Sequence, residues 1–216
     1  MKRLSISFLS LLAAALLAGC AALDVVASYG RASLGELLAA HPALLVRDET
    51  DPYMRLSADG ETYLLVSRDF GASGDEDILI QTPLQPFLDA GLDESKLPEG
   101  YRADGALFFV CADYGVGTGA RADFADALFE APAYDPGLLT YHGALDHFGV
   151  ALSHGKFEWA KDEAKNDKDI VFVLDAARLR GLGADAANVA GWTLVTMQDE
   201  KGGDFDVLIK AYDLAP

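Results

Sequence analysis

Apolar residues alternate with polar ones over several short stretches of this chain, which is the two-residue period of half-buried strands. Two of these stretches, 53–67 and 101–113, are each interrupted by an Ala-Asp-Gly turn, so each is predicted to form a hairpin. The run 106–112 is almost continuously apolar, which predicts a central strand covered on both faces. Further strands are expected at 77–81, 156–159 and 170–174, and a terminal hairpin is expected from 192–198 and 206–212.

Other stretches have the three- and four-residue spacing of apolar residues that is typical of helices. Ser33–Glu36 matches a capping box, which predicts a helix start, and Pro42 marks the end of that helix. Thr82 and Pro83 predict the start of a second helix, which Gly91 ends. Helices are also expected over 122–131 and 141–150, with two short helical pieces between 176 and 189.

These elements amount to strands in hairpins with helices inserted between them. We therefore expect an α+β fold, in which residues 33–216 form a single domain on a mainly antiparallel sheet. The sequence contains no boundary linker and no convincing internal repeat. The two Ala-Asp-Gly turns, at 58–60 and 103–105, are only a weak hint of duplication.

The first twenty residues follow a different pattern. Lys2 and Arg3 precede an apolar run, 4–17, which is broken only by serines and leads through small residues to Cys20. A positive start, a short apolar region and small residues before a cleavage point are typical of an export signal, and the run is too short to span a membrane. We expect residues 1–19 to be removed from the mature protein.

The sequence Leu17-Ala18-Gly19-Cys20 resembles the lipobox of bacterial lipoproteins. In that class the cysteine is diacylated on sulfur, the peptide is cut before it, and the new amino terminus is acylated. The resemblance therefore implies lipidation of Cys20, with residues 20–32 as a lipidated cysteine and short tether, and a lipid-anchored, extracytoplasmic protein of the cell envelope. Ala21 is not the aspartate associated with inner-membrane retention, which favours the outer membrane in a host with two membranes.

Net charge narrows the choice of partners. The full chain carries a formal charge of −17. A surface of that charge repels the phosphates of nucleic acids, so we expect no nucleic-acid partner. The expected partners are the membrane, which the N-terminal lipid would enter, and either a small ligand or an envelope protein.

A glycine-rich stretch lies between the predicted strand 106–112 and the helix 122–131. Its glycines, Gly115, Gly117 and Gly119, fit the pattern of a dinucleotide-binding turn, and Arg121 follows them. Two residues separate the strand from the first glycine and the preceding elements read as hairpins, so a mobile loop beside a cleft is the preferred interpretation and no cofactor is expected.

Histidines gather between residues 142 and 154. On the predicted helix 141–150, His142 and Asp146 would share a face at i,i+4, whereas His142 and His147 would not. With Tyr141, they are candidate ligand-binding residues. A zinc or copper site needs three or four converging ligands, which this spacing does not supply, so no metal is expected.

Cys111 is the other candidate for chemistry. A nearby histidine could activate it as a nucleophile. Because Cys111 lies within the most apolar predicted strand, an inert buried thiol is the preferred interpretation, although the sequence leaves its reactivity open.

Two hypotheses for function follow. The favoured one is a non-catalytic envelope lipoprotein that binds a small ligand or a partner protein near the membrane. The alternative is an envelope hydrolase or metal-dependent enzyme that uses the His142–His154 region. The alternative requires His142 or His147 to meet Cys111 or two carboxylates in one pocket.

Overall fold

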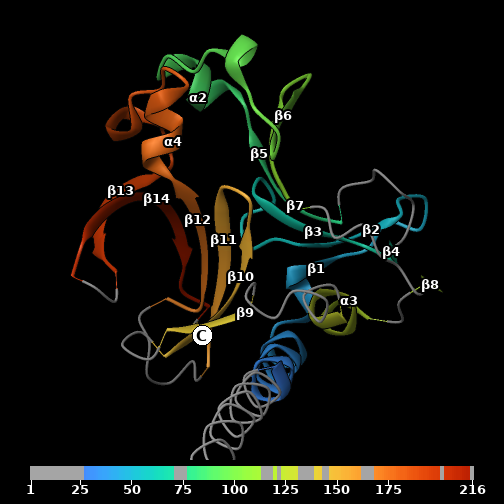
Figure 1. Ribbon diagram of the computed structural model, residues 1–216. Coiled ribbons are helices and arrows are strands. Elements are labelled where there is room, and N and C mark those ends of the chain that lie inside the picture. Colours follow the sequence, from blue (N-terminus) through green and yellow to red (C-terminus); the bar gives the residue numbers. More distant parts are fainter. Residues whose placement is uncertain are drawn as a thin grey trace, which may run out of the picture.

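The computed structural model describes residues 27–70, 77–112, 119–120, 123–130, 139–142, 146–161, 168–199 and 202–214 (Figure 1). Its helical segments are 27–40, η1 (Pro42–Leu44), α2 (Gln85–Asp89), η2 (Glu94–Lys96), α3 (Phe124–Glu130), α4 (Ala176–Gly181) and η6 (Ala186–Asn188). Its strands are β1 (Leu45–Val46), β2 (Tyr53–Leu56), β3 (Tyr63–Ser67), β4 (Asp69–Phe70), β5 (Ile78–Pro83), β6 (Tyr101–Asp104), β7 (Leu107–Ala112), β8 (Gly119–Ala120), β9 (Leu139–His142), β10 (His147–Leu152), β11 (Gly155–Ala160), β12 (Ile170–Asp175), β13 (Thr193–Gln198) and β14 (Asp204–Tyr212).

The strands form two antiparallel sheets of six strands each, and β4 pairs with β8 in a small third sheet. The expected α+β class with antiparallel strands and inserted helices is therefore confirmed, with two large sheets. Figure 1 shows the first sheet, in blue to green, facing the second, in yellow to red. None of the helices in the described part of the chain has the length and apolar character needed to span a bilayer.

The two sheets have the same topology. The first has the order β1-β2-β3-β5-β7-β6, and the second, counted from its other edge, has the order β9-β10-β11-β12-β14-β13. In each sheet the fourth strand in space is followed along the chain by a short helix, a 3-10 turn and a final hairpin. We call residues 27–112 the first half and residues 123–214 the second half. The expectation of no internal repeat is wrong at the level of structure.

Strand register confirms that the halves match residue by residue. Ile78 pairs with Ala112 in the first sheet, and Ile170 pairs with Tyr212 in the second. The residue before each isoleucine is a buried aspartate, and its N–H donates to the carbonyl of the same partner, at 3.0 Å for Asp77 and 2.8 Å for Asp169. β5 and β12 are therefore equivalent, offset by 92 positions.

The halves also contact each other reciprocally. The N–H of Asp93 donates to the carbonyl of Leu182 at 2.9 Å, and the equivalent N–H of Asp185 donates to the carbonyl of Ala90 at 2.7 Å. Reciprocal contacts between equivalent residues are what a two-fold arrangement of the halves produces. The sequence hides this repeat because few equivalent residues are identical; across 77–98 and 169–190 they are Asp77 and Asp169, Ile78 and Ile170, Gly91 and Gly183, and Asp93 and Asp185.

One core lies between the sheets and contains side chains of both. In the first sheet alternate residues of β5 and β7 face it, as the fully buried Ile80 and Phe108 do. In the second sheet Phe157, Trp159 and Phe172 face it in the same way. β7 is covered on both faces, as its apolar run predicted. Its opposite side forms a second cluster, here called the outer cluster, of Leu65, Leu79, Phe109 and Cys111.

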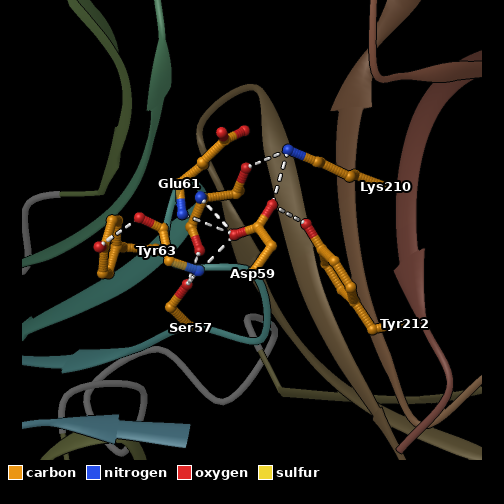
Figure 2. A network of polar contacts seen from close by, with 8 residues as sticks. Ser57, Asp59, Glu61, Tyr63, Lys210 and Tyr212 are labelled. Atoms are coloured by element: carbon orange, nitrogen blue, oxygen red, sulfur yellow. Dashed lines mark hydrogen bonds and ion pairs between the residues drawn. The ribbon is translucent and has the colours of Figure 1, made fainter.

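A polar contact joins the two sheets at the β2–β3 turn (Figure 2). Lys210 Nζ on β14 lies 2.8 Å from Asp59 Oδ2 and 2.8 Å from Thr62 Oγ1, and the Tyr212 hydroxyl donates to Asp59. Burial by itself would raise the pKa of Asp59, but the Lys210 ammonium and the hydrogen-bond donors around the carboxylate lower it well below its usual range. We call Asp59, Thr62, Lys210 and Tyr212 the inter-sheet latch.

Three expected helix positions are wrong. Ser33 lies inside the helix 27–40, where its hydroxyl donates to the carbonyl of Ala160 at 3.2 Å, so it anchors the helix to β11 and does not cap it. Thr82 and Pro83 end strand β5, and Pro86 occupies the first turn of α2. The expected helix 141–150 is the hairpin of β9 and β10, because pairing between strands overrides the helical spacing of its apolar residues.

The remaining predicted elements are confirmed apart from shifts at their ends. The Ala-Asp-Gly turns join β2 to β3 and β6 to β7, and α3 lies within the expected helix 122–131. Gly91, which follows the C-cap residue Ala90 of α2, has a φ of 95°, the left-handed conformation expected of a glycine that ends a helix. The short helices α4 and η6 and the hairpin of β13 and β14 are also where they were expected.

Candidate functional site

The candidate site is a groove of about 700 Å³ on the face of the second sheet that is turned away from the core. Strand alternation explains which residues reach it. Phe157, Phe172 and Leu208 point into the core, so their neighbours along the strands point into the groove. Alternation places Lys156, Glu158, Val173, Asp175, Met197, Phe205 and Val207 of β11 to β14 in the groove, and Gly155, Asp204 and Asp206, which have the phase of the core residues, also line it.

The hairpin of β13 and β14 forms one wall of the groove. Val207 is the first residue of β14 that pairs with β12, so residues 204–206 extend beyond β12 with β13 as their only paired strand among those described. Figure 1 shows both strands curving strongly along their length. Met197 and Phe205 pair directly across this extension, and the side chain of Phe205 remains 43% exposed. The groove therefore has an apolar wall that is open to solvent.

The opposite wall carries buried charge. Glu158 on β11 is only 5% exposed, its carboxylate lies 2.9 Å from Lys156 Nζ, and its second oxygen lies 3.7 Å from Nδ1 of His147. The other ring nitrogen of His147 lies 3.1 Å from the carbonyl of Lys168. Burial by itself would raise the pKa of Glu158, but His147 and Lys156 together lower it below its usual value. Glu158 therefore stays ionised beside the groove.

A glycine makes room for these side chains. Gly149 on β10 pairs with Glu158 on β11 and with Thr140 on β9. A Cβ atom at Gly149 would lie 2.9 Å from Thr140 Oγ1, 3.1 Å from Cγ of Glu158 and 3.2 Å from Cδ of Lys156. The side chains of Glu158 and Lys156 therefore pack over the bare backbone of Gly149.

Acidic side chains surround the curved hairpin. Asp206 pairs with Arg180 of α4 at 2.7 Å and accepts a hydrogen bond from Thr196 at 2.6 Å, and its pKa lies below the usual value for these reasons, with Thr196 the larger cause. Asp204 accepts a hydrogen bond from Gln198 at 3.0 Å and has no ion pair among the described residues. The groove thus combines an apolar wall, a buried carboxylate and an acidic rim.

The structure brings together only part of the site that the sequence predicted. Tyr141, His142 and Asp146 lie at one end of the β9–β10 hairpin, where Tyr141 donates a hydrogen bond to Asp146. His142 pairs directly with His147, so the two share a face, contrary to the expectation. Of these residues, His147 contacts a groove-lining side chain, that of Glu158.

The glycine-rich stretch is not part of the groove as far as it is described. Gly119 lies in β8, which pairs with β4 next to the first half. Gly115, Gly117 and Arg121 lie outside the described residues. A smaller cleft of about 360 Å³ lies beside β1 and β2, but two of its arginines bind their own loop: Arg55 pairs with Asp51, and Arg68 donates to the carbonyl of Asp51.

Cys111 lies near one histidine through the backbone, since the N–H of Ser153, the residue before His154, donates to the carbonyl of Cys111 at 3.3 Å. Cys111 is buried in the outer cluster on the first sheet. His154 stacks on Tyr101, with ring centroids 4.4 Å apart, and Tyr101 belongs to the core on the opposite face of that sheet. In the described part of the chain, no three His, Cys, Asp or Glu side chains converge in a way that would hold a metal ion.

Comparison with models of known protein families, with curated proteins and with solved structures finds no match.

Sequence reasoning missed the apolar side of the groove, which consists of Val173, Met197, Phe205 and Val207. Val173, Met197 and Val207 alternate with core residues in strands that the sequence did predict, and Phe205 lies just before the predicted strand 206–212. What the sequence did not reveal is whether another part of the protein covers the face of the sheet on which these residues lie. A strand with apolar residues on both faces usually has both faces covered, whereas here one face opens into the groove.

Proposed function

We propose that this chain is a lipid-anchored protein of the bacterial cell envelope whose domain binds a small ligand or a partner protein in the groove without catalysing a reaction. The anchor is supported by the charged start, the apolar run and the lipobox-like sequence ending at Cys20. The single observation that carries the binding role is the groove itself. Its volume is within the range of ligand sites, and it joins an apolar wall to a few fixed polar groups.

Comparison between the halves supports this proposal. At the positions equivalent to Lys156 and Glu158, the first half has Tyr63 and Leu65, which belong to or pack against the outer cluster. The framework therefore does not require polar residues there. The buried charge and the open apolar wall belong to the second half and not to what the halves share, which is typical of a site grafted on a fold.

The alternative, a hydrolase or metal-dependent enzyme using the His142–His154 region, has less support. It needs His142 or His147 to meet Cys111 or two carboxylates in one pocket. Within the described residues, the imidazole of His147 contacts one carboxylate, that of Glu158, and a backbone carbonyl. An ion pair on the wall of a groove fits binding better than nucleophilic catalysis.

Two measurements test the proposal. The variant Cys20→Ala should move the protein from the membrane fraction to the soluble fraction with an unchanged melting temperature, because the acyl chains are the proposed anchor. Continued membrane retention would contradict the anchor.

The groove can be tested with the neutral apolar dye Nile red. We expect saturable fluorescence enhancement that falls at least about tenfold in affinity in Val173→Glu, since a charge would then occupy the apolar wall. The matched control is Gln81→Glu at the equivalent position of the first sheet, which should bind the dye as the parent does. Equal binding by Val173→Glu and the parent would contradict the binding role of the groove.

A further inference from the structure

β13 is an edge strand that lacks the usual protection against pairing. It lies at the outer edge of the second sheet, and its six residues, Thr193–Gln198, include no charged side chain. The equivalent edge strand of the first sheet, β6, has four residues, of which Arg102 and Asp104 are charged. Proteins commonly block sheet edges with charges and short strands, so the two equivalent edges differ in the property that controls strand addition.

The hairpin register shows which backbone groups of β13 face outward. The N–H of Asp199 donates to the carbonyl of Gly203 at 2.9 Å, one step beyond the pair Gln198 and Asp204. Hydrogen-bonded and non-hydrogen-bonded pairs alternate along an antiparallel ladder. Val195 and Met197 therefore direct their backbone groups at β14, while Leu194, Thr196 and Gln198 direct theirs away from it. In the described part of the molecule no other strand pairs with this edge.

A strand added beside β13 would have two chemically different faces. Side chains on one face would continue the apolar wall formed by Met197 and Phe205. Side chains on the other face would lie on the side of Thr196, where Asp204 and Asp206 are located. This alternation calls for apolar residues on one face of the added strand and basic residues on the other.

Charge decides between a foreign segment and a second copy of the chain. A second copy would bring another formal charge of −17 and its own Asp204 against the same edge. Like charges that meet at an interface are costly, whereas a basic segment is attracted. The occupant is therefore a partner protein and not this chain itself.

We propose that β13 binds an extended segment of a partner protein as a seventh strand of the second sheet, with apolar side chains entering the groove and basic side chains meeting the acidic rim. This mode of recognition takes affinity from backbone hydrogen bonds and selectivity from alternate side chains. The inference rests on the proposed binding function and specifies its partner as an extended, alternating apolar and basic polypeptide.

The probe is the peptide acetyl-Lys-Val-Lys-Val-Lys-Val-Lys-amide, added to the full chain in detergent solution. We expect a saturable change in the amide NMR signals of β13 and slower hydrogen exchange at Leu194, Thr196 and Gln198, because their N–H groups gain partners. A peptide that is N-methylated at alternate residues should bind at least about tenfold more weakly, and so should the Glu-for-Lys peptide.

A proline provides the matched variant. Thr196→Pro removes an outward N–H and should weaken peptide binding at least about tenfold without breaking the ladder to β14. Thr196→Val loses the same hydroxyl but keeps the N–H, so it should bind as the parent does. If Thr196→Pro does not fold, the N-methylated peptide with the parent protein decides the question.

Three results would overturn the inference. One is equal binding of the plain and N-methylated peptides, which would mean recognition by side chains in the groove alone. Another is absence of peptide binding by a folded parent protein. The third is a parent dimer that Thr196→Pro dissociates, which would assign the edge to a second copy. None of these results affects the membrane release of Cys20→Ala or the binding of Nile red. The proposed function is therefore tested independently of the strand-addition inference.

Discussion

The two halves of this molecule agree on one face of each sheet and differ on the other. Facing the core, most equivalent positions hold apolar side chains in both halves, such as Ile80 and Phe172, which are both fully buried. An exception is Lys210, which stands at the position of the buried Val110. Facing outward, the first sheet has the apolar outer cluster, while the second has Glu158 with its charged neighbours and the groove. The shared face maintains the fold, and the divergent face is where function is expected.

The largest expected effect is at the shared face. Phe172→Ala should lower the free energy of unfolding by about 3–5 kcal/mol, because it removes a fully buried ring from the core between the sheets. Ile80→Ala at the equivalent position should cost about 2–5 kcal/mol. Both are measured by urea unfolding followed by tryptophan fluorescence and circular dichroism. We expect the two probes to coincide, and separate transitions for the two sheets would contradict a single shared core.

A pair of equivalent positions on the divergent face should give smaller and unlike effects. Leu65→Ala in the outer cluster should cost about 2–4 kcal/mol at every pH, because only packing is lost. Glu158→Gln should cost about 2 kcal/mol near neutral pH, since Lys156 and His147 lose their ionised partner.

The pH dependence separates these two variants. The folded pKa of Glu158 is lowered, so its contribution is present above the ordinary glutamate pKa of about 4.3 and is lost as the pH falls through the folded value. The parent should therefore lose more stability than Glu158→Gln between about pH 6 and about pH 3, while Leu65→Ala should follow the parent. Urea midpoints at the two pH values measure this, and parallel slopes for all three proteins would contradict the buried ion pair.

The smallest effect is expected at the inter-sheet latch. Tyr212→Phe removes the hydroxyl that donates to Asp59 and should cost about 1 kcal/mol, because Lys210 and Thr62 remain in place. The equivalent residue of the first half is Ala112, which has no hydroxyl to lose. Thermal unfolding at neutral pH should show a lowered midpoint, and an unchanged midpoint would mean that the hydroxyl adds nothing to the contact between the sheets.

Most strands could be predicted from the sequence because their signals are local. The apolar run 106–112 and the Ala-Asp-Gly turns specify β7 and two hairpins without reference to distant residues. The β9–β10 hairpin failed for the opposite reason. Tyr141, Leu145 and Phe148 have helical spacing, and pairing with β9 and β11 makes β10 a strand. Ser33 failed similarly, because its partner, the carbonyl of Ala160, is distant in sequence.

The candidate site was harder to predict than the fold. His147 was among the expected ligand-binding residues and does lie beside the groove through Glu158. Phe205 and Met197 gave no signal, because an exposed apolar residue in a strand cannot be told from a buried one without knowing what covers it. The repeat was hidden because buried positions tolerate changes of apolar residue, as the equivalent Ile80 and Phe172 illustrate.

The reciprocal contact between Gly91 and Gly183 has an evolutionary consequence. A Cβ atom on either glycine would lie within 3 Å of the other's carbonyl oxygen, at 2.9 and 2.8 Å, so neither position can change alone without disturbing its counterpart. At other positions one half can change without its counterpart, because both halves are encoded separately in one chain. In a dimer of identical subunits every substitution appears twice, whereas here a new side chain enters one copy only. A charged pair and an open groove can therefore be present in the second half while the equivalent positions of the first half stay apolar.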